Sequence, residues 1–190
     1  MSKAAGPYLS GKVLVAMPGI GDERFERAVI FLVAHDTDHA MGLTVNRPVD
    51  GLTVGNLLKR LGVLAGSNTP DDLVLFGGPV ERERGFVVHT DDYRGEHSLE
   101  VGGGVALSAT REVLEAMAGQ TAPPRLSRLA LGYAGWGAGQ LENEIKQNVW
   151  LTCDPDEGLI FDDDFDHKWS RALAKLGVDP RRLSAVAGRA

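Results

Sequence analysis

Short runs rich in Val, Ile, Leu and Phe recur along this chain, and most are closed by Gly, Pro, Asn or Asp. Such runs are typical of β-strands. Several, such as AVIFLVAH at residues 28–35, are continuously apolar, which indicates strands covered on both faces. Helices must supply part of that cover. We expect strands at Lys12–Met17, Ala28–Ala34, Met41–Asn46, Leu73–Phe76, Gly85–His89, Val105–Leu107, Arg128–Tyr133, Val149–Thr152 and Leu159–Phe161.

Helical patterns fall between these runs. In the last of them, Trp169, Ala172, Leu173 and Leu176 recur at the spacing of one buried helix face. Strands group as hairpins early and alternate with helices later, so we expect a mixed sheet with helices packed on it. The chain is predicted to form one α/β domain over residues 1–190. The expected helices are Val54–Leu61, Thr110–Ala118, Gln140–Gln147 and His167–Leu176.

The composition is that of an ordinary soluble globular protein, with 43% hydrophobic and 24% charged residues. Cys153 is the single cysteine, which excludes a disulfide within the chain and suits a reducing compartment. The apolar run Val13–Met17 ends at Pro18 and is too short for a signal-peptide core or a membrane span. We therefore expect a cytoplasmic protein without a membrane partner.

The net charge of −6 and the pI of about 5.3 give a field that repels phosphate backbones. The basic residues near the C-terminus, among them Lys168, Arg171 and Lys175, are offset by neighbouring aspartates. They are interpreted as a solvated helix face. The charge pattern thus disfavours direct nucleic-acid binding.

The segment His35–His39 carries two histidines and two aspartates, which are metal-ligand residue types. It lies between two apolar strands, however, and is most simply a polar hairpin turn. An extended or turning backbone does not align two imidazoles as a helical HExxH motif does. We predict neither a metal nor another cofactor.

Nucleophilic catalysis has no recognisable signature. The chain lacks a G-x-S-x-G elbow, and Cys153 ends an apolar strand, where a small buried residue is expected. His89 also ends a strand and could point into a cleft, but the sequence supplies no partner to activate it. Enzymatic activity therefore stays open, with binding without catalysis favoured.

The motif GYAGWGAGQLENEI, residues 132–145, has the strand–turn–helix context of a phosphate site. Its glycines at Gly135, Gly137 and Gly139 fail the G-x-G-x-x-G spacing. Glu142 and Glu144 place carboxylates in the first helical turns, where a phosphate would otherwise sit. We interpret the glycines as a tight corner around Trp136. The motif FGGPV, residues 76–80, is interpreted as a turn in which glycine adopts positive φ.

These motifs together resemble the YqgE/AlgH family of bacterial cytosolic proteins. The resemblance rests on LSGKVLVAMPGIGDERFERAVIFLVAHD, AMGLTVNRP, LFGGPVERERGFVVH, GYAGWGAGQLENEI, NVWL, FD and Trp169, and it runs nearly from end to end. It implies an α/β fold with a mixed, bifurcated β-sheet curled into a pseudo-barrel with flanking helices. The family carries the label of a transcriptional regulator, but it has no established catalytic residues and no recognisable DNA-binding motif.

Positions that match the family signature give a tentative ligand-binding set: Asn46, Arg47, Gly78, His89, Trp136, Gln140 and Glu144. One hypothesis is a regulatory protein that acts without catalysis, through a protein partner. The alternative is a small-ligand-binding protein or enzyme whose cleft gathers these side chains from the signature loops. Each residue also has a local interpretation: Asn46 and Arg47 cap a turn before Pro48, and Gln140 and Glu144 tie down their own helix.

Overall fold

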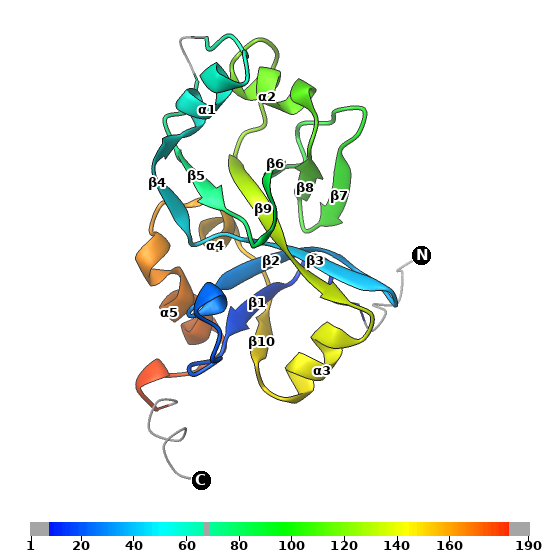
Figure 1. Cartoon of the computed structure of the whole chain (residues 1–190), viewed down its shortest axis with the longest axis vertical. Helices are drawn as coiled ribbons and strands as arrows, with labels where there is room; N and C mark the ends of the chain where they lie inside the picture. Colours follow the sequence, from blue (N-terminus) through cyan, green and yellow to red (C-terminus); the bar gives the residue numbers. More distant parts are fainter. Residues whose placement is uncertain (1–7, 67–68, 183–190) are drawn as a thin grey trace.

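The computed structural model describes residues 8–66 and 69–182, so both ends of the predicted domain lie outside the described residues. Within them the chain forms a ten-stranded, mixed sheet that is curled into a half-barrel and flanked by helices (Figure 1). This confirms the fold that the family resemblance implies. The strands are β1 (Val13–Ala16), β2 (Val29–His35), β3 (His39–Thr44), β4 (Pro48–Thr53), β5 (Leu73–Phe76), β6 (Val80–Thr90), β7 (Leu99–Gly102), β8 (Val105–Ser108), β9 (Ser127–Gly137) and β10 (Trp150–Cys153).

The described helices lie at different places around the sheet. α1 and α2 stand at the top of Figure 1, α3 at the bottom, and α4 and α5 beside β1 and β2. None of them is long and apolar enough to cross a membrane. They are η1, a 3-10 helix (Glu23–Phe25), α1 (Val54–Arg60), α2 (Arg111–Met117), α3 (Gln140–Lys146), α4 (Glu157–Phe161) and α5 (Phe165–Lys175).

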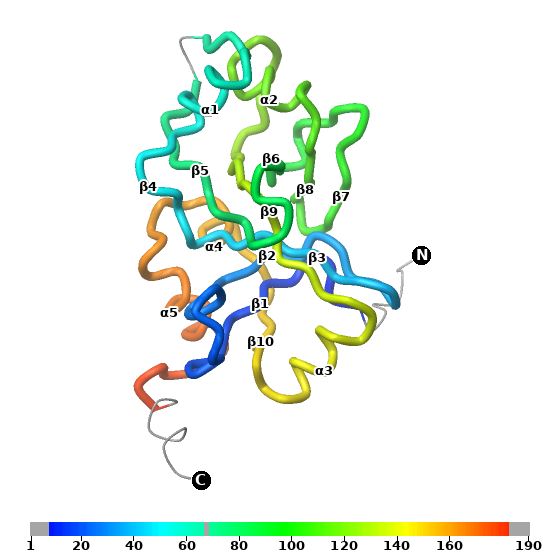
Figure 2. The backbone as a smooth tube through the Cα atoms, viewed as in Figure 1, coloured from blue at the N-terminus to red at the C-terminus, as the bar shows by residue number. Residues whose placement is uncertain are grey.

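β9 joins the two halves of the bifurcated sheet. Its first part pairs with β6 and, in parallel, with β5, whereas residues 134–137 pair with β3. Between the two parts, Gly132 has a φ of 74°, a conformation that side chains disfavour and that interrupts a regular strand. The path of the chain through this crossing can be followed in Figure 2. The bend lets one strand serve both halves and carries the chain on to α3.

The apolar runs form strands buried on both faces, as predicted. Along β1, Val13 and Val15 face a core shared with α4 and α5, while Leu14 and Ala16 face a core shared with α3 and the end of β9. A third core lies under α1 and α2 against β6 and β9. Each group of helices thus covers its own part of the sheet.

The structure corrects the prediction of a strand at Leu159–Phe161, which is the end of α4. Asp156 caps this helix by accepting a hydrogen bond from Leu159 N at 2.8 Å. A three-residue apolar run fits a strand or a buried helical turn equally well, so periodicity could not decide. Two described strands were not predicted: β4 has no fully buried residue, and β7 is largely exposed.

Candidate functional site

A cleft of about 400 Å³ lies between the loop that carries η1, the beginning of β6 and one face of α3. Three of the predicted site residues, Trp136, Gln140 and Glu144, line it. Trp150 and Phe25 complete an aromatic wall in which each ring meets the next edge-on, Phe25 against Trp150 and Trp150 against Trp136. The cleft therefore combines aromatic with polar side chains, as small-molecule sites commonly do.

The carboxylate of Glu144 is held by hydrogen bonds from three side chains. Trp136 Nε1 and Trp150 Nε1 both donate to Glu144 Oε2 at 2.8 Å, and Gln140 Nε2 donates to Oε1 at 3.1 Å. The two indoles are 6% and 2% exposed, so their N–H groups need a protein acceptor. Oε1 has received one hydrogen bond and can accept another.

The corner between β9 and α3 places this network. Gly139 turns the chain with a φ of 71°, and Gln140 Oε1 accepts a hydrogen bond from Gly137 N at 3.0 Å. The same Gln140 side chain thus braces the corner and orients Glu144. The interpretation of the glycines as a tight corner holds for Gly139, whereas Gly135 and Gly137 lie within β9 without positive φ. The local interpretation of Gln140 agrees with the structure.

The loop that carries η1 also brings Asp22 and Arg24 to the cleft. Arg24 donates to Asp22 Oδ1 from Nε at 3.0 Å and to Oδ2 from Nη2 at 2.8 Å. These hydrogen bonds lower the pKa of the Asp22 carboxyl. The guanidinium of Arg24 remains largely exposed at the rim and lies over the Phe25 ring. The cleft is therefore bordered by charges of both signs.

Asn46 and Arg47 do not line the cleft but hold the backbone of its wall. Asn46 Oδ1 accepts from Val29 N at 3.0 Å and its Nδ2 donates to Arg27 O at 2.9 Å. Arg47 donates to the carbonyl of Glu26 at 2.7 Å, and also to those of Glu23 and Arg24. Burial lowers the pKa of this guanidinium. Arg47, predicted as a ligand-binding residue of the cleft, instead holds the backbone of the loop that carries η1.

Gly78 serves the packing of the fold. A Cβ atom there would lie 2.0 Å from the Tyr133 carbonyl carbon of β9. Neither Gly77 nor Gly78 has positive φ, so the predicted reason for glycine in this turn is wrong. Glycine is needed because two backbones approach closely.

His89 does not reach the cleft, because it is fully buried in the interior. Its Nδ1 lies 2.9 Å from Thr90 O and its Nε2 lies 2.8 Å from Ser108 Oγ, which in turn lies 2.7 Å from Ser98 Oγ. The pairing of β6 with β8 brings these partners together across a long stretch of sequence. A single cleft that gathers the whole predicted set is therefore wrong for His89.

The sequence model of the family described as AlgH-like matches residues 13–181. The chain belongs to the AlgH-like family. Curated relatives include a UPF0301 protein of Caulobacter vibrioides, 64% identical over 97% of this chain and 95% of the relative, and one of Rhodospirillum rubrum, 49% identical over 96% and 95%.

Solved structures agree with the AlgH-like fold. The solution structure of the AlgH protein from Pseudomonas aeruginosa has a TM-score of 0.79 and 39% identity, covering 100% of this chain and 98% of that one. Protein DIP2367 from Corynebacterium diphtheriae has a TM-score of 0.72 at 20% identity, covering 97% and 94%. The second likeness concerns the fold alone. The names of these relatives state no biochemical activity.

The histidine pair of this AlgH-like protein forms a hairpin turn between β2 and β3, as predicted. His35 Nε2 lies 2.9 Å from Glu142 Oε1, and His35 Nδ1 accepts from Leu9 N at 3.0 Å. His39 pairs with Asp36 instead. Among the described residues, no group of three or more His, Cys, Asp or Glu could hold a metal ion.

Lys168 is the clearest correction to the predicted solvated face. It is fully buried, and its Nζ donates to Val45 O at 3.1 Å and Ile160 O at 3.3 Å. Burial lowers its pKa to about 8, although Asp162 opposes the shift. The sequence did contain a signal for this burial. Lys168 lies next to Trp169 and four residues before Ala172, and Trp169 and Ala172 both belong to the apolar stripe of the helix.

Proposed function

We propose that this AlgH-like protein is a regulatory protein that binds a small ligand in the cleft without transforming it. The observation that carries this proposal is the Glu144 carboxylate, which lines the cleft, is fixed by two indoles and an amide, and can accept a further hydrogen bond at Oε1. A preorganised acceptor loses little freedom when a ligand donates to it. The polar lining side chains are two amides, an arginine and two carboxylates that are already hydrogen-bonded, which suit binding better than acid–base chemistry.

The ligand class follows from the lining side chains. Glu144 can accept a hydrogen bond from a ring N–H, an amide or an amino group. The half-buried ring of Phe25, with the edges of Trp136 and Trp150 beside it, favours a planar group next to that donor. A volume of about 400 Å³ lies within the range of small-molecule sites. A planar heterocycle with N–H donors meets these conditions.

The regulatory step is proposed to pass through the loop that carries η1. A ligand that touches Arg24 or Phe25 would hold this loop, which Arg47 and Asn46 fasten to the corner between β3 and β4. A change in the order of the loop would alter the surface offered to a protein partner. A cytoplasmic location and such a partner stay predictions.

A thermal-shift screen of planar, N–H-bearing metabolites tests the proposal. A ligand at 100 times its dissociation constant should stabilise the fold by about 2.7 kcal/mol. Val80, 37% exposed at the cleft, offers a blocking variant, Val80→Phe, and Leu99, 52% exposed on β7, offers the matched control Leu99→Phe.

The wild-type protein and Leu99→Phe should respond alike, and Val80→Phe should respond weakly. An equal response of Val80→Phe would place the ligand elsewhere. No stabilisation by any metabolite would contradict ligand binding and favour action through a protein partner alone.

A further inference from the structure

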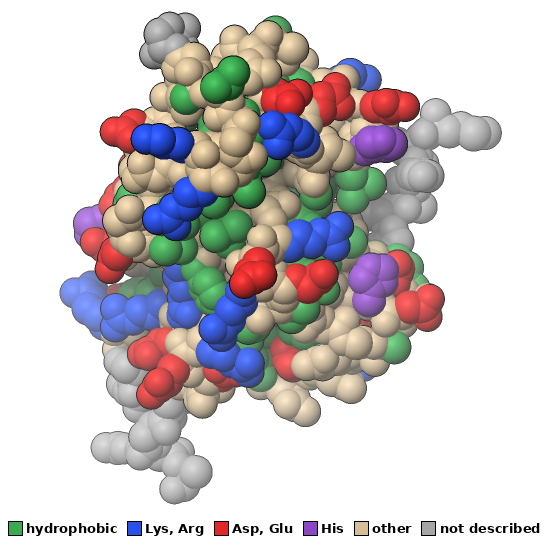
Figure 3. Space-filling model, turned by 45° about the horizontal axis from the view of Figure 1, so that its top comes forward, with side chains coloured by type: hydrophobic (Ala, Val, Ile, Leu, Met, Phe, Trp, Pro, Cys, Tyr) green, Lys and Arg blue, Asp and Glu red, His purple; other side chains and the backbone are tan. Residues whose placement is uncertain are grey.

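A second hollow, of about 290 Å³, lies under α1 and α2 against the strands β6 and β9. Val87, Leu129 and Leu131 form its floor, and Leu57, Val113 and Leu114 form its walls. It shares no residue with the cleft. On the face turned towards the viewer in Figure 3, hydrophobic side chains reach the surface among charged ones. A hollow of this kind provides an apolar environment inside the fold.

Gly85 lies in the floor of the hollow, and the backbone does not require a glycine there. Its φ is not positive, and an added Cβ atom would meet nothing nearer than Leu129 Cδ1 at 3.6 Å, an ordinary contact. Gly78, by contrast, leaves no room for a Cβ atom. Glycine inside a strand weakens it and often marks a bulge. The pairing of β6 with β9 does shift register between Val80 and Gly85, but neither the φ of Gly85 nor the space around it excludes a larger residue, so the glycine has a further reason.

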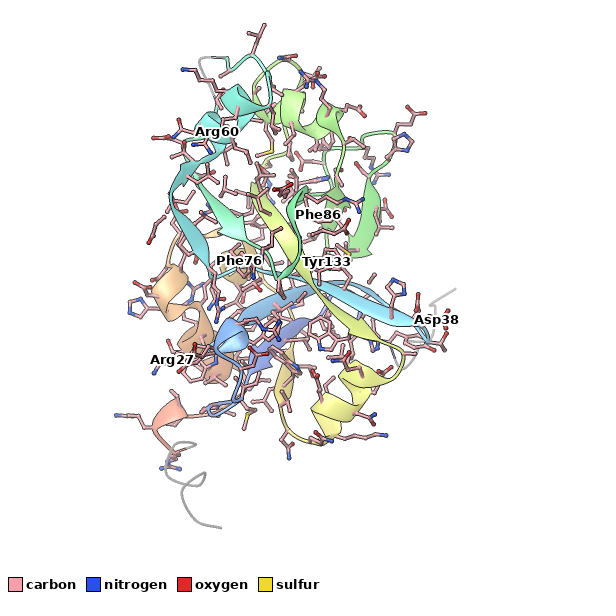
Figure 4. The ribbon with its side chains drawn as sticks, viewed as in Figure 1. Arg27, Asp38, Arg60, Phe76, Phe86 and Tyr133 are labelled. Atoms are coloured by element: carbon pink, nitrogen blue, oxygen red, sulfur yellow. The ribbon has the colours of Figure 1, made fainter. Side chains whose placement is uncertain are left out.

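The alternation of β6 supplies that reason. Phe86 turns to the other face of the strand, where its ring lies edge-on to Tyr133 with centroids 5.8 Å apart (Figure 4). Gly85 and Val87 therefore face the hollow. A side chain at position 85 would occupy the floor, and glycine leaves this space open.

The roof of the hollow is fixed by hydrogen bonds. Arg111, at the start of α2, donates to Leu61 O and Gly62 O, each at 3.2 Å, and its Nε donates to Glu115 at 3.0 Å. These bonds tie α2 to the end of α1. They also occupy the guanidinium, so Arg111 acts as a clamp and not as an anion receptor.

The mouth of the hollow carries charges of both signs. Arg84 lies 3.5 Å from Glu81 and over the Phe86 ring, 5.1 Å from its centroid, and Arg111 pairs with Glu115. A carboxylate would therefore meet arginines that are already paired, and an ammonium group would meet the exposed carboxylate of Glu83, where an ion pair contributes little. An uncharged polar group can donate a hydrogen bond to Glu83.

We propose that this hollow binds a compact apolar molecule, a ring or short alkyl chain of roughly ten non-hydrogen atoms, with one uncharged polar end. The size follows because a cavity of about 150 Å³ already holds benzene. The apolar part would lie over Gly85 against Val87 and Leu129, with its polar end at Glu83.

Three probes with the same body separate the head groups: 4-ethylphenol, 4-ethylbenzoate and 4-ethylbenzylammonium at neutral pH. Each is titrated into the full ¹⁵N-labelled chain and followed by NMR. We expect 4-ethylphenol to shift the amides of Gly85, Val87 and Leu129 and to bind at least fivefold more tightly than either ion. Tighter binding of an ion, or no shift at these amides, would overturn the proposal.

The graded variants Gly85→Ala, Gly85→Val and Gly85→Leu test the role of the open floor. Affinity for 4-ethylphenol should fall with side-chain size, by at least tenfold for Gly85→Leu. Asp50→Leu is the control for a leucine added to a strand, because Asp50 is exposed on β4 and lines neither the hollow nor the cleft. If Gly85→Leu does not fold, Ala and Val still give the trend. Unchanged affinity across the folded variants would refute the proposal.

Discussion

Trp136 and Trp150 donate their indole N–H groups to the same oxygen atom, Glu144 Oε2, each at 2.8 Å. The two residues belong to different strands, β9 and β10, and α3 connects these strands. The carboxylate therefore fastens the helix to both strands while it forms part of the cleft. The side chain of Glu144 therefore contributes both to the stability of the fold and to the proposed ligand site.

Glu144→Ala should lower the free energy of unfolding by about 2–4 kcal/mol, because two buried indole N–H groups lose their acceptor. Glu144→Gln keeps one acceptor oxygen and should cost only about 1–2 kcal/mol. Urea unfolding measures both values. If the urea midpoint of Glu144→Ala equalled that of the wild-type protein, water would replace the carboxylate as acceptor without loss of stability.

Arg47→Met should loosen the loop around η1, since the carbonyls of Glu23, Arg24 and Glu26 lose their donor. We expect the amides of Phe25 and Ala28 to exchange hydrogen roughly tenfold faster, which corresponds to about 1.4 kcal/mol of local stability. Arg94→Met is the control, because Arg94 is exposed and pairs with Glu100 of β7. Equal hydrogen-exchange rates in the two variants would show that Arg47 does not hold the loop.

Two signature glycines should respond in opposite directions to alanine. Gly78→Ala forces a Cβ atom to 2.0 Å from the backbone of β9 and should destabilise the fold by more than about 3 kcal/mol. Gly85→Ala meets only an ordinary contact and should stabilise it by about 0.4–1 kcal/mol. Thermal unfolding of the pair measures the difference. A loss of stability in Gly85→Ala would assign that glycine a structural role.

Lys168 should make stability depend on pH. Its folded-state pKa of about 8 lies below the ordinary value of 10.5, so the folded state releases the proton first as pH rises. The cost of the buried ammonium is present in full below pH 8 and is relieved between pH 8 and pH 10.5. The free energy of unfolding should rise across this window by about 3 kcal/mol from this group.

The variant Lys168→Met isolates this contribution from other groups that titrate at high pH. Urea unfolding of both proteins at several pH values gives the difference between them. That difference should increase in favour of the wild-type protein as pH rises from 8 towards 10.5. A constant difference would mean that the lysine keeps its ordinary pKa.

The sequence predicted those elements of the fold whose apolar pattern lies within one short segment of the chain. Continuous apolar runs such as that of β2 identified strands covered on both faces, because alternate residues must each find a core. Short or exposed elements were missed: α4 offers only one turn of apolar residues, and β7 exposes most of its side chains.

The site was harder to predict, because its geometry depends on pairings between distant residues. The sequence identified Trp136, Gln140 and Glu144, which share one corner, but not that Trp150 shares their carboxylate. It placed Arg47 at a ligand, whereas the side chain reaches back more than twenty residues to three carbonyls. Strand register decides such contacts, and a motif does not encode it.

The indole N–H signals of the three tryptophans give the sharpest test of ligand binding in the cleft. Trp136 and Trp150 report on the cleft, whereas Trp169 donates to Ala16 O at 2.8 Å in another core and serves as an internal control. In a ¹H–¹⁵N NMR titration with planar N–H-bearing metabolites, we expect saturable shifts of the first two signals while that of Trp169 stays in place. The absence of any shift at Trp136 and Trp150, or equal shifts at all three, would contradict such binding.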